Sequence, residues 1–240
     1  MIGSKKRNVV QITRQNISYY DEIALNYDAI LNGDGFNTII RDKVAAEFTS
    51  LVKGGSILDF GGGTGRDMGW LIQHHYRITF CEPSTAMRQI AIDRRKSEFP
   101  DSSISFFNDN ETDFRSWNSI FPFEEKVNAI LANFAVINCI PDIEFLFEKL
   151  ALAIKPGGII LALMLENSLT KRLRSNLKGS LMSFISGNPL SITIDYNGKR
   201  QLVYIHSNRA IKKALANNFE FNHLERLREF GFCLIHLVRK

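Results

Sequence analysis

Residues 56–65, Ser-Ile-Leu-Asp-Phe-Gly-Gly-Gly-Thr-Gly, join a short apolar run to a glycine-rich loop, and residues 66–76 after them have helical character. A strand that ends in glycines and leads into a helix brings backbone N–H groups and a helix N-terminus against a ligand, with no side chain in the way. This stretch therefore predicts the first strand and a ligand-binding loop of an α/β fold.

The spacing of the glycines restricts the kind of ligand. A dinucleotide-binding fingerprint requires Gly-x-Gly-x-x-Gly or Ala. Counting from Gly61 gives Gly63 and then Arg66, so this register fails and a nicotinamide oxidoreductase is disfavoured. The pattern that is present is Gly-x-Gly-x-Gly, ending at Gly65 and beginning two residues after Asp59.

Short apolar runs and helical segments alternate along the chain on both sides of this loop. We expect strands at 56–60, 78–81, 104–107, 127–137 and 159–165, and helices at 66–76, 84–91 and 142–154. Strands separated by helices predict a parallel sheet with both faces covered. The runs 219–227 and 232–238 predict a final antiparallel hairpin. The expected fold is a doubly wound, Rossmann-like α/β fold with a seven-stranded, mostly parallel sheet.

Two further segments belong to the same predicted domain, which spans residues 1–240. Residues 17–52 have a helical pattern before the first strand. After the fifth strand, residues 168–207 form an excursion. Its leucines recur every four residues over 169–185 with Lys and Arg mostly off that stripe, which predicts an amphipathic helix with a basic side. Alternating residues around Asn197-Gly198 predict a hairpin, so the insertion consists of a helix and a hairpin.

Cysteine usage and hydropathy exclude several classes of protein. The 3 cysteines are far apart and show no metal-ligand spacing, so neither a disulfide framework nor a metal site is predicted. No signal peptide is evident, and no apolar run approaches the roughly 20 residues that a bilayer requires. We therefore expect a cytoplasmic protein that does not contact a membrane.

Positive charge is concentrated in the last third of the chain. From residue 168 onward there are thirteen Lys or Arg against four Asp or Glu, although the whole chain has a net charge of +5. Two interpretations follow. Such a bias is typical of a solvated surface, and it is equally typical of a protein whose partner or substrate carries negative charge, such as a carboxylate, phosphate, acyl carrier or nucleic acid.

Four motifs follow one another over residues 59–158. They are the glycine loop after Asp59, Glu82-Pro83 with Met87 on the next helix, Asp109 after the third strand, and Lys155-Pro156-Gly157-Gly158 before the fifth. Together they resemble the class I methyltransferases that use S-adenosylmethionine (SAM), in particular the small-molecule methyltransferase domain related to ubiquinone-biosynthesis enzymes. The resemblance implies SAM as the cofactor and S-adenosylhomocysteine (SAH) as the product.

The resemblance also implies a role for each motif residue. Asp59 would accept from the ammonium group of SAM, Glu82 from the ribose hydroxyls, and Asp109 from the adenine amino group. Two carboxylate oxygens suit a diol. A helix cap at Glu82 and a turn at Asp109 are the structural alternatives. The expected cofactor-binding residues are Tyr27, Asp59, Gly61, Gly62, Gly63, Gly65, Glu82, Pro83, Met87, Asp109, Asn110, Asn133 and Phe134.

Residues 20–28 are similar to the lid segment of this family, in which a tyrosine closes over the methionine end of SAM. Tyr27 is the first candidate for that position and Tyr20 the second. The expectation is that residues 1–52 form a helical lid. Residues 168–207 would then form a cap on the acceptor side, with the basic helix favouring an anionic acceptor.

Methyl transfer from a sulfonium is an in-line displacement on an activated carbon, so alignment and exclusion of water can supply most of the acceleration. A general base is optional, and no catalytic residue is assigned. Tyr204 and His206 share one face of a predicted strand and are candidates for contacting the acceptor. We interpret the chain as a methyltransferase acting on O, N or C of a small molecule. An RNA or other macromolecule methyltransferase and a noncatalytic SAM-binding protein are the alternatives.

Overall fold

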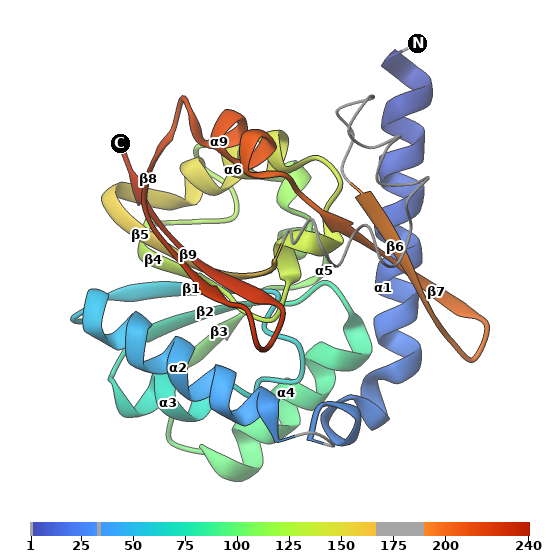
Figure 1. The fold of residues 1–240 in the computed structure, drawn as a ribbon. Coiled ribbons are helices and arrows are strands. Elements are labelled where there is room, and N and C mark those ends of the chain that lie inside the picture. Colours follow the sequence, from blue (N-terminus) through green and yellow to red (C-terminus); the bar gives the residue numbers. More distant parts are fainter. Residues whose placement is uncertain (1, 33–34, 167–189) are drawn as a thin grey trace.

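The centre of the structure is a seven-stranded sheet (Figure 1). The computed structural model describes residues 2–32, 35–166 and 190–240. The strand order is β3-β2-β1-β4-β5-β9-β8, in which the first five strands are parallel and β9 is antiparallel to both neighbours. The strands are β1 (Ser56–Phe60), β2 (Arg77–Cys81), β3 (Ile104–Phe106), β4 (Val127–Ala132), β5 (Ile154–Leu165), β8 (Phe219–Leu227) and β9 (Phe232–Arg239). The predicted Rossmann-like fold with its C-terminal antiparallel pair is confirmed.

Helices cover both faces of this sheet (Figure 1). One face carries α2 (Phe36–Leu51), α3 (Met68–Gln73) and α4 (Thr85–Glu98), and the other carries α6 (Ile143–Ala153) and α9 (Asn208–Leu215). Successive side chains of a strand point to opposite faces. Ile57 of β1 accordingly packs in one core with Phe48 of α2, while the next residue, Leu58, packs in the other with Leu146 of α6. All four side chains are fully buried, and each such burial stabilises the fold by about 2 kcal/mol.

The segment after β4 differs from the prediction. Strand β4 ends at Ala132, so the predicted continuation to residue 137 is wrong. Phe134 and Ala135 have φ values of 48° and 63°, which lie outside the β region. The backbone N–H of Ala135 donates to the carbonyl of Leu163 at 2.9 Å, which holds the chain in this turn. A 3-10 helix, η2 (Val136–Cys139), follows and lies at the carboxyl end of the sheet.

The hairpin predicted in the insertion is present. It consists of β6 (Leu190–Tyr196) and β7 (Lys199–Ile205), which form a separate two-stranded sheet. Asn197 and Gly198 between them have φ values of 49° and 76°, as a type I′ turn requires. The amphipathic helix predicted over 169–185 lies outside the described residues.

The N-terminal helix α1 (Ile2–Asn32) stands at one side of the sheet, next to this hairpin (Figure 1). The Asn16 side chain joins the two elements, because its Nδ2 donates to the carbonyl of Leu202 at 2.9 Å and its Oδ1 accepts from the Leu202 N–H at 2.8 Å. Two short helices, α5 (Asp109–Thr112) and η1 (Phe114–Ser116), follow β3. Among the helices described here, none is long and apolar enough to cross a membrane.

Candidate functional site

A cavity of about 420 Å³ lies between α1 and the carboxyl ends of the strands, where the strand order reverses between β1 and β4. Open α/β sheets bind their ligands at this position. The residues that follow β1, β2 and β4 line the cavity, and α1 contributes a wall between Thr13 and Tyr27. The volume falls in the range of roughly 300 to 1,000 Å³ that is usual for small-molecule sites.

The glycine loop contributes backbone to this cavity. Gly61, Gly62 and Gly63 all line it. A Cβ atom at residue 61, where φ is 76°, would lie 2.5 Å from the Val136 side chain, so this position is closely packed against η2. A Cβ at residue 63 would meet Tyr27 at 3.8 Å, an ordinary contact distance. The loop therefore presents its backbone to the cavity at Gly63.

Gly65, although predicted as a cofactor-binding residue, is not among the residues that line the cavity. Its φ is 79°, and a Cβ there would lie 2.6 Å from the Met68 side chain and 3.2 Å from Ala91. The glycine at this position therefore allows α3 and α4 to pack closely against the loop.

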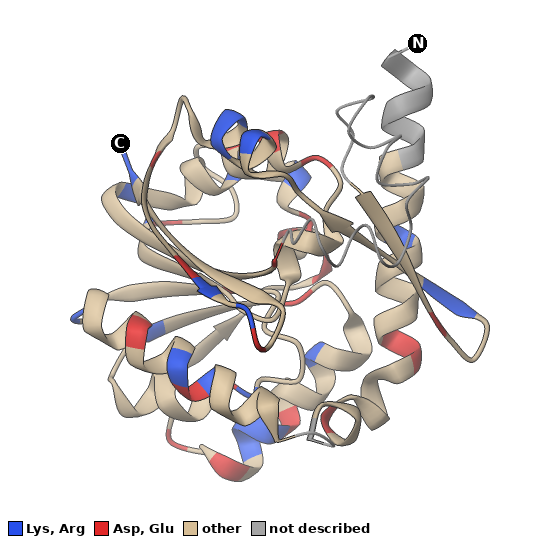
Figure 2. Ribbon diagram, viewed as in Figure 1, with Lys and Arg blue, Asp and Glu red and all other residues tan. Residues whose placement is uncertain are grey.

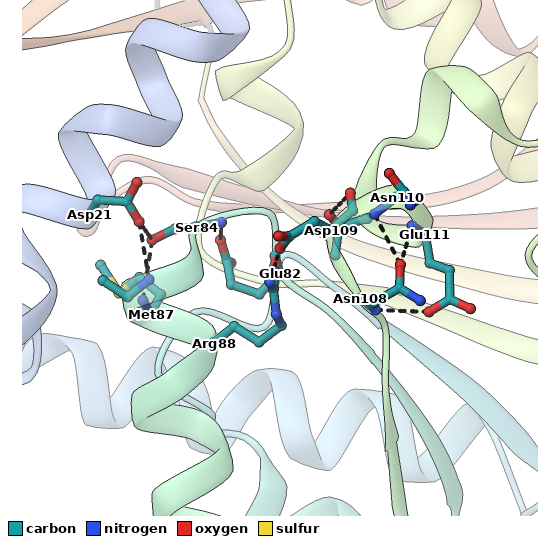
Figure 3. Close-up of polar contacts among 11 residues, drawn as sticks. Asp21, Glu82, Ser84, Met87, Arg88, Asn108, Asp109, Asn110 and Glu111 are labelled. Atoms are coloured by element: carbon teal, nitrogen blue, oxygen red, sulfur yellow. Dashed lines mark hydrogen bonds and ion pairs between the residues drawn. The ribbon is translucent and has the colours of Figure 1, made fainter.

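Glu82, labelled in Figure 3, follows β2. It is buried, with 7% of its surface exposed. Its Oε2 accepts from the N–H of Gly63 at 3.0 Å, and its Oε1 accepts from the N–H of Ser84 at 2.8 Å. Burial raises the pKa of Glu82 from 4.5 to about 7, although the two N–H donors oppose this shift. The carboxylate is thus held in one orientation, and each oxygen keeps a further lone pair for a ligand hydroxyl.

Asp59 lies beneath the glycine loop and does not line the cavity. It is 1% exposed, and its Oδ2 has no hydrogen-bond partner within the described chain. Burial, with the nearby carboxylates of Asp67 and Glu82, raises its pKa well above the ordinary value. A buried carboxylate oxygen without a donor is costly, so this position favours a ligand or water that supplies one.

Arg88 of α4 connects two of the predicted acidic residues (Figure 3). Its guanidinium forms an ion pair with Asp109 and donates from Nη1 to the backbone carbonyl of Glu82 at 2.6 Å. Asp109 lines the cavity, as do Pro83 and Met87. The sequence analysis missed this arginine, because nothing in the helical pattern of α4 distinguishes it from the other basic residues there.

Asn110 is exposed and is not among the cavity residues. Its backbone N–H donates to the Asn108 side chain at 3.0 Å, within the capping box that begins α5. The backbone N–H of this predicted cofactor-binding residue is therefore engaged in helix capping.

A second group of polar residues surrounds Asn133 and Phe134, which both line the cavity. The Asn133 Nδ2 donates to Asp67 Oδ2 at 3.0 Å, and Arg41 pairs with Asp67 Oδ1 at 2.5 Å. The Arg41 guanidinium also lies over the Phe134 ring, 4.5 Å from its centroid. Arg41 and Asp67 line the cavity too, and the sequence prediction missed both.

Helix α1 is fastened to the site at two points. Asp21 accepts from the Ser84 hydroxyl at 2.6 Å at the start of α4 (Figure 3). Asp28 accepts from the Thr64 hydroxyl at 2.6 Å and pairs with Arg94 at 2.5 Å. Burial opposes ionisation of Asp28, but these two partners keep its pKa below the usual value. The helix therefore covers the cavity in a fixed position at its C-terminal half.

Tyr27, between these two points, lines the cavity, and burial raises its pKa. Tyr20, which comes earlier in α1, also lines the cavity. Tyr204 and His206 are buried and are not among the cavity residues. The backbone carbonyl of Tyr204 accepts from Asn138 at 2.7 Å, and His206 Nε2 lies 3.1 Å from the carbonyl of Ile140. These contacts attach β7 to the segment around η2.

The comparisons with known proteins agree with this architecture. The family described as a methyltransferase domain matches residues 34–225, which is most of the chain. The chain belongs to this family of methyltransferase domains. No curated protein sequence shows significant similarity to it.

Several solved structures share the fold. A complex of DhpI with SAH has 16% identity, a TM-score of 0.65, and coverage of 95% of this chain and 97% of that chain. The 1,6-didemethyltoxoflavin-N1-methyltransferase of Burkholderia thailandensis, with bound 1,6-didemethyltoxoflavin and SAH, has 13% identity, a TM-score of 0.66, and coverage of 97% and 90%. A SAM-dependent methyltransferase of Clostridium acetobutylicum has 13% identity, a TM-score of 0.62, and coverage of 91% and 98%.

Proposed function

We propose that this protein transfers a methyl group from SAM to an O, N or C atom of a small-molecule acceptor that carries negative charge. The observation that carries the cofactor assignment is the Glu82 carboxylate. It lines the cavity at the strand-order switch point, and the N–H groups of Gly63 and Ser84 fix both of its oxygens. Such a carboxylate is suited to binding the two hydroxyls of a ribose.

The remaining residues fit the other parts of SAM. Gly61, Gly62 and Gly63 offer backbone without side chains to the methionine portion. Asp59 Oδ2, which has no hydrogen-bond partner within the described chain, can accept from the ammonium group directly or through a water molecule. Arg41 supplies positive charge for the carboxylate of the methionine portion of SAM.

On the nucleoside side, Met87 packs against the base and Asp109 accepts from its amino group. SAM bound in this way supplies a methyl group on a sulfonium, an electrophile that needs no further activation. The task of the chain is therefore to bind, to orient and to exclude water.

In this proposal, helix α1 excludes water from the cavity. Residues 1–52 act as the lid, and Tyr27 closes over the cavity near Gly63. Residues 168–207 form the acceptor-side cap, of which the described part is the β6–β7 hairpin. The whole chain, residues 1–240, works as one methyltransferase domain.

A small-molecule acceptor agrees with the distribution of basic residues. In the described C-terminal part, Lys and Arg lie on β7, on α9 and on or beside the last two strands, which are separate parts of the ribbon (Figure 2). Arg200, Lys213 and Arg226 are each paired with an acidic residue. A nucleic-acid surface would instead gather unpaired basic residues on one face.

Calorimetry with SAM and SAH tests the cofactor assignment. We expect both to bind the wild-type protein, and a Kd above about 1 mM for both, equivalent to roughly 4 kcal/mol of binding, would contradict it. Glu82→Ala should bind markedly less tightly, whereas Glu124→Ala, at an exposed position outside the cavity, should bind like the wild type.

Methyl-labelled SAM tests the acceptor class and separates the alternatives. After incubation with a cell extract divided into low-molecular-mass compounds and RNA, we expect the label in the low-molecular-mass fraction. Label in RNA would favour the macromolecular alternative. Binding of SAM with no transfer to either fraction would favour a noncatalytic SAM-binding protein.

A further inference from the structure

The hydroxyl of Tyr20 is held in one orientation at the wall of the cavity. Gln201 Nε2 donates to the Tyr20 oxygen at 2.6 Å. The Cys139 sulfur lies 3.5 Å from the Tyr20 oxygen and 3.3 Å from Gln201 Nε2. A phenolic oxygen that already accepts a hydrogen bond has its own proton left to donate. A thiol sulfur is a weak acceptor, so the stronger partner for this proton is an oxygen of a ligand in the cavity.

Three elements fix this arrangement. Tyr20 comes from α1, Cys139 from η2 and Gln201 from β7. Gln201 is 5% exposed, and the neighbouring residue Leu202 is bound through both backbone groups by Asn16. Asn16 Nδ2 also donates to the carbonyl of Cys139 at 3.0 Å, so one asparagine ties all three elements together. The position of the Tyr20 oxygen is therefore held by the hairpin and by η2.

A second hydrogen-bond donor in the same cavity has no partner among the residues that the structure describes. Asp113 accepts from Arg115 Nε at 2.7 Å and from Arg115 Nη2 at 3.1 Å. The remaining nitrogen, Nη1, is buried and makes no hydrogen bond within the described chain. Arg14 of α1 also lines the cavity and forms no ion pair with any described residue. These groups offer N–H bonds and positive charge to a ligand.

In the part of the chain that the structure describes, the cavity groups that could remove a proton are bound to other partners. Four carboxylates line the cavity in the described ranges, and each is held by other groups. Asp67 and Asp113 pair with arginines, Asp109 pairs with Arg88, and both oxygens of Glu82 accept backbone N–H groups. Burial raises the pKa of the Tyr20 hydroxyl well above its ordinary value, so it stays protonated at neutral pH. Burial likewise raises the pKa of Cys139.

We propose that the Tyr20 hydroxyl donates a hydrogen bond to the nucleophilic oxygen of the acceptor, and that this oxygen enters the cavity already ionised, as in a carboxylate. This inference rests on the proposed methyltransferase function and narrows its acceptor to an oxygen acid. Tyr20 is an acceptor-binding residue, and Gln201 is a positioning residue that directs its proton into the cavity.

Methyl transfer to a carboxylate needs no general base. A lone pair of the carboxylate oxygen forms the O–C bond to the methyl group, and the electron pair of the C–S bond passes to sulfur. The anion becomes a neutral ester and the sulfonium becomes a neutral thioether, so no proton is released and Tyr20 keeps its own. The donor groups around the cavity hold the anion in line for this displacement.

Binding of benzoate and of its uncharged counterpart benzamide tests the proposal. Each is titrated by calorimetry into the full-length protein saturated with SAH. We expect the wild-type protein to bind benzoate at least about tenfold more tightly than benzamide, because a hydrogen bond to a charged acceptor contributes about 1.5 to 3 kcal/mol. Tyr20→Phe should lower this preference by at least about fivefold, with the affinity for SAH unchanged within a factor of about two.

Two further variants separate orientation from a general structural role. Gln201→Met keeps the volume but removes the donor, and should lower the preference for benzoate by about threefold while SAH still binds normally. Tyr196→Phe removes a hydroxyl from the same hairpin at a residue outside the cavity, and should change neither affinity.

Equal binding of benzoate and benzamide, absence of benzoate binding, or an undiminished preference in Tyr20→Phe would overturn this inference. Failure of the wild-type protein to bind SAH would instead refute the proposed function. The two failures are therefore distinguishable in one set of titrations.

Discussion

Replacing Glu82 with Gln should weaken SAH binding by about two orders of magnitude. The carboxylate accepts from Gly63 at 3.0 Å and from Ser84 at 2.8 Å, and the proposed ribose contacts use its remaining lone pairs. A glutamine has one acceptor oxygen, so its NH2 group must face one of these N–H donors and can no longer accept from one ribose hydroxyl. One lost hydrogen bond to a charged group, with the other weakened, costs about 3 kcal/mol, which corresponds to roughly 100-fold in Kd.

Isothermal titration calorimetry with SAH measures this change directly, and circular dichroism verifies that the variant is folded. Glu124→Gln is the matched control, because Glu124 is exposed and does not line the cavity. A folded Glu82→Gln protein whose affinity for SAH falls by less than about threefold would show that the ribose does not bind to this carboxylate.

Three other predictions concern the same site. Because burial raises the pKa of Glu82 to about 7, the carboxylate that accepts from the ligand is lost as the pH falls through 7. The affinity for SAH should therefore be constant above pH 8 and about tenfold lower at pH 6, and Glu82→Gln should remove this pH dependence. Gly61→Ala places a Cβ 2.5 Å from the Val136 side chain, so we expect the free energy of unfolding, measured by thermal denaturation, to fall by about 1 to 3 kcal/mol. The double variant with Val136→Ala should recover part of this loss. Arg88→Met leaves the Glu82 carbonyl without its donor and should lower the stability by about 1 to 3 kcal/mol and weaken SAH binding; an unchanged melting temperature would contradict this role.

The sheet could be predicted because its signals are local. Strand β1 and its glycine loop follow from a short apolar run and glycine spacing, and the β6–β7 hairpin follows from Asn197-Gly198. The end of β4 could not be predicted in the same way. Phe134 and Ala135 are not residues that favour positive φ, and the turn depends on a hydrogen bond to the distant Leu163.

The site could be predicted in part for the same reason. Glu82 and Asp109 follow strands, so their positions at one edge of the sheet are set by topology. Arg41 and Arg88 act through partners distant in sequence, and no spacing rule connects a basic residue on a helix with a particular carboxylate.

Period-two alternation correctly placed Tyr204 on a strand, but β7 ends at Ile205 and His206 follows it, so the prediction that both share a strand is wrong for His206. It could not tell which neighbouring element that face would meet. The contacts of these residues with Asn138 and Ile140 come from the docking of β7 against the η2 segment, which is a tertiary feature.

The close packing of Gly61 against Val136 couples the glycine loop to η2. Val136 occupies the space that a side chain at residue 61 would need, so the glycine loop and η2 cannot shift independently. Helix η2 also carries Cys139, which contacts Tyr20. Ligands on the two sides of this contact should therefore change each other's affinity, and linkage requires the factor to be the same in both directions.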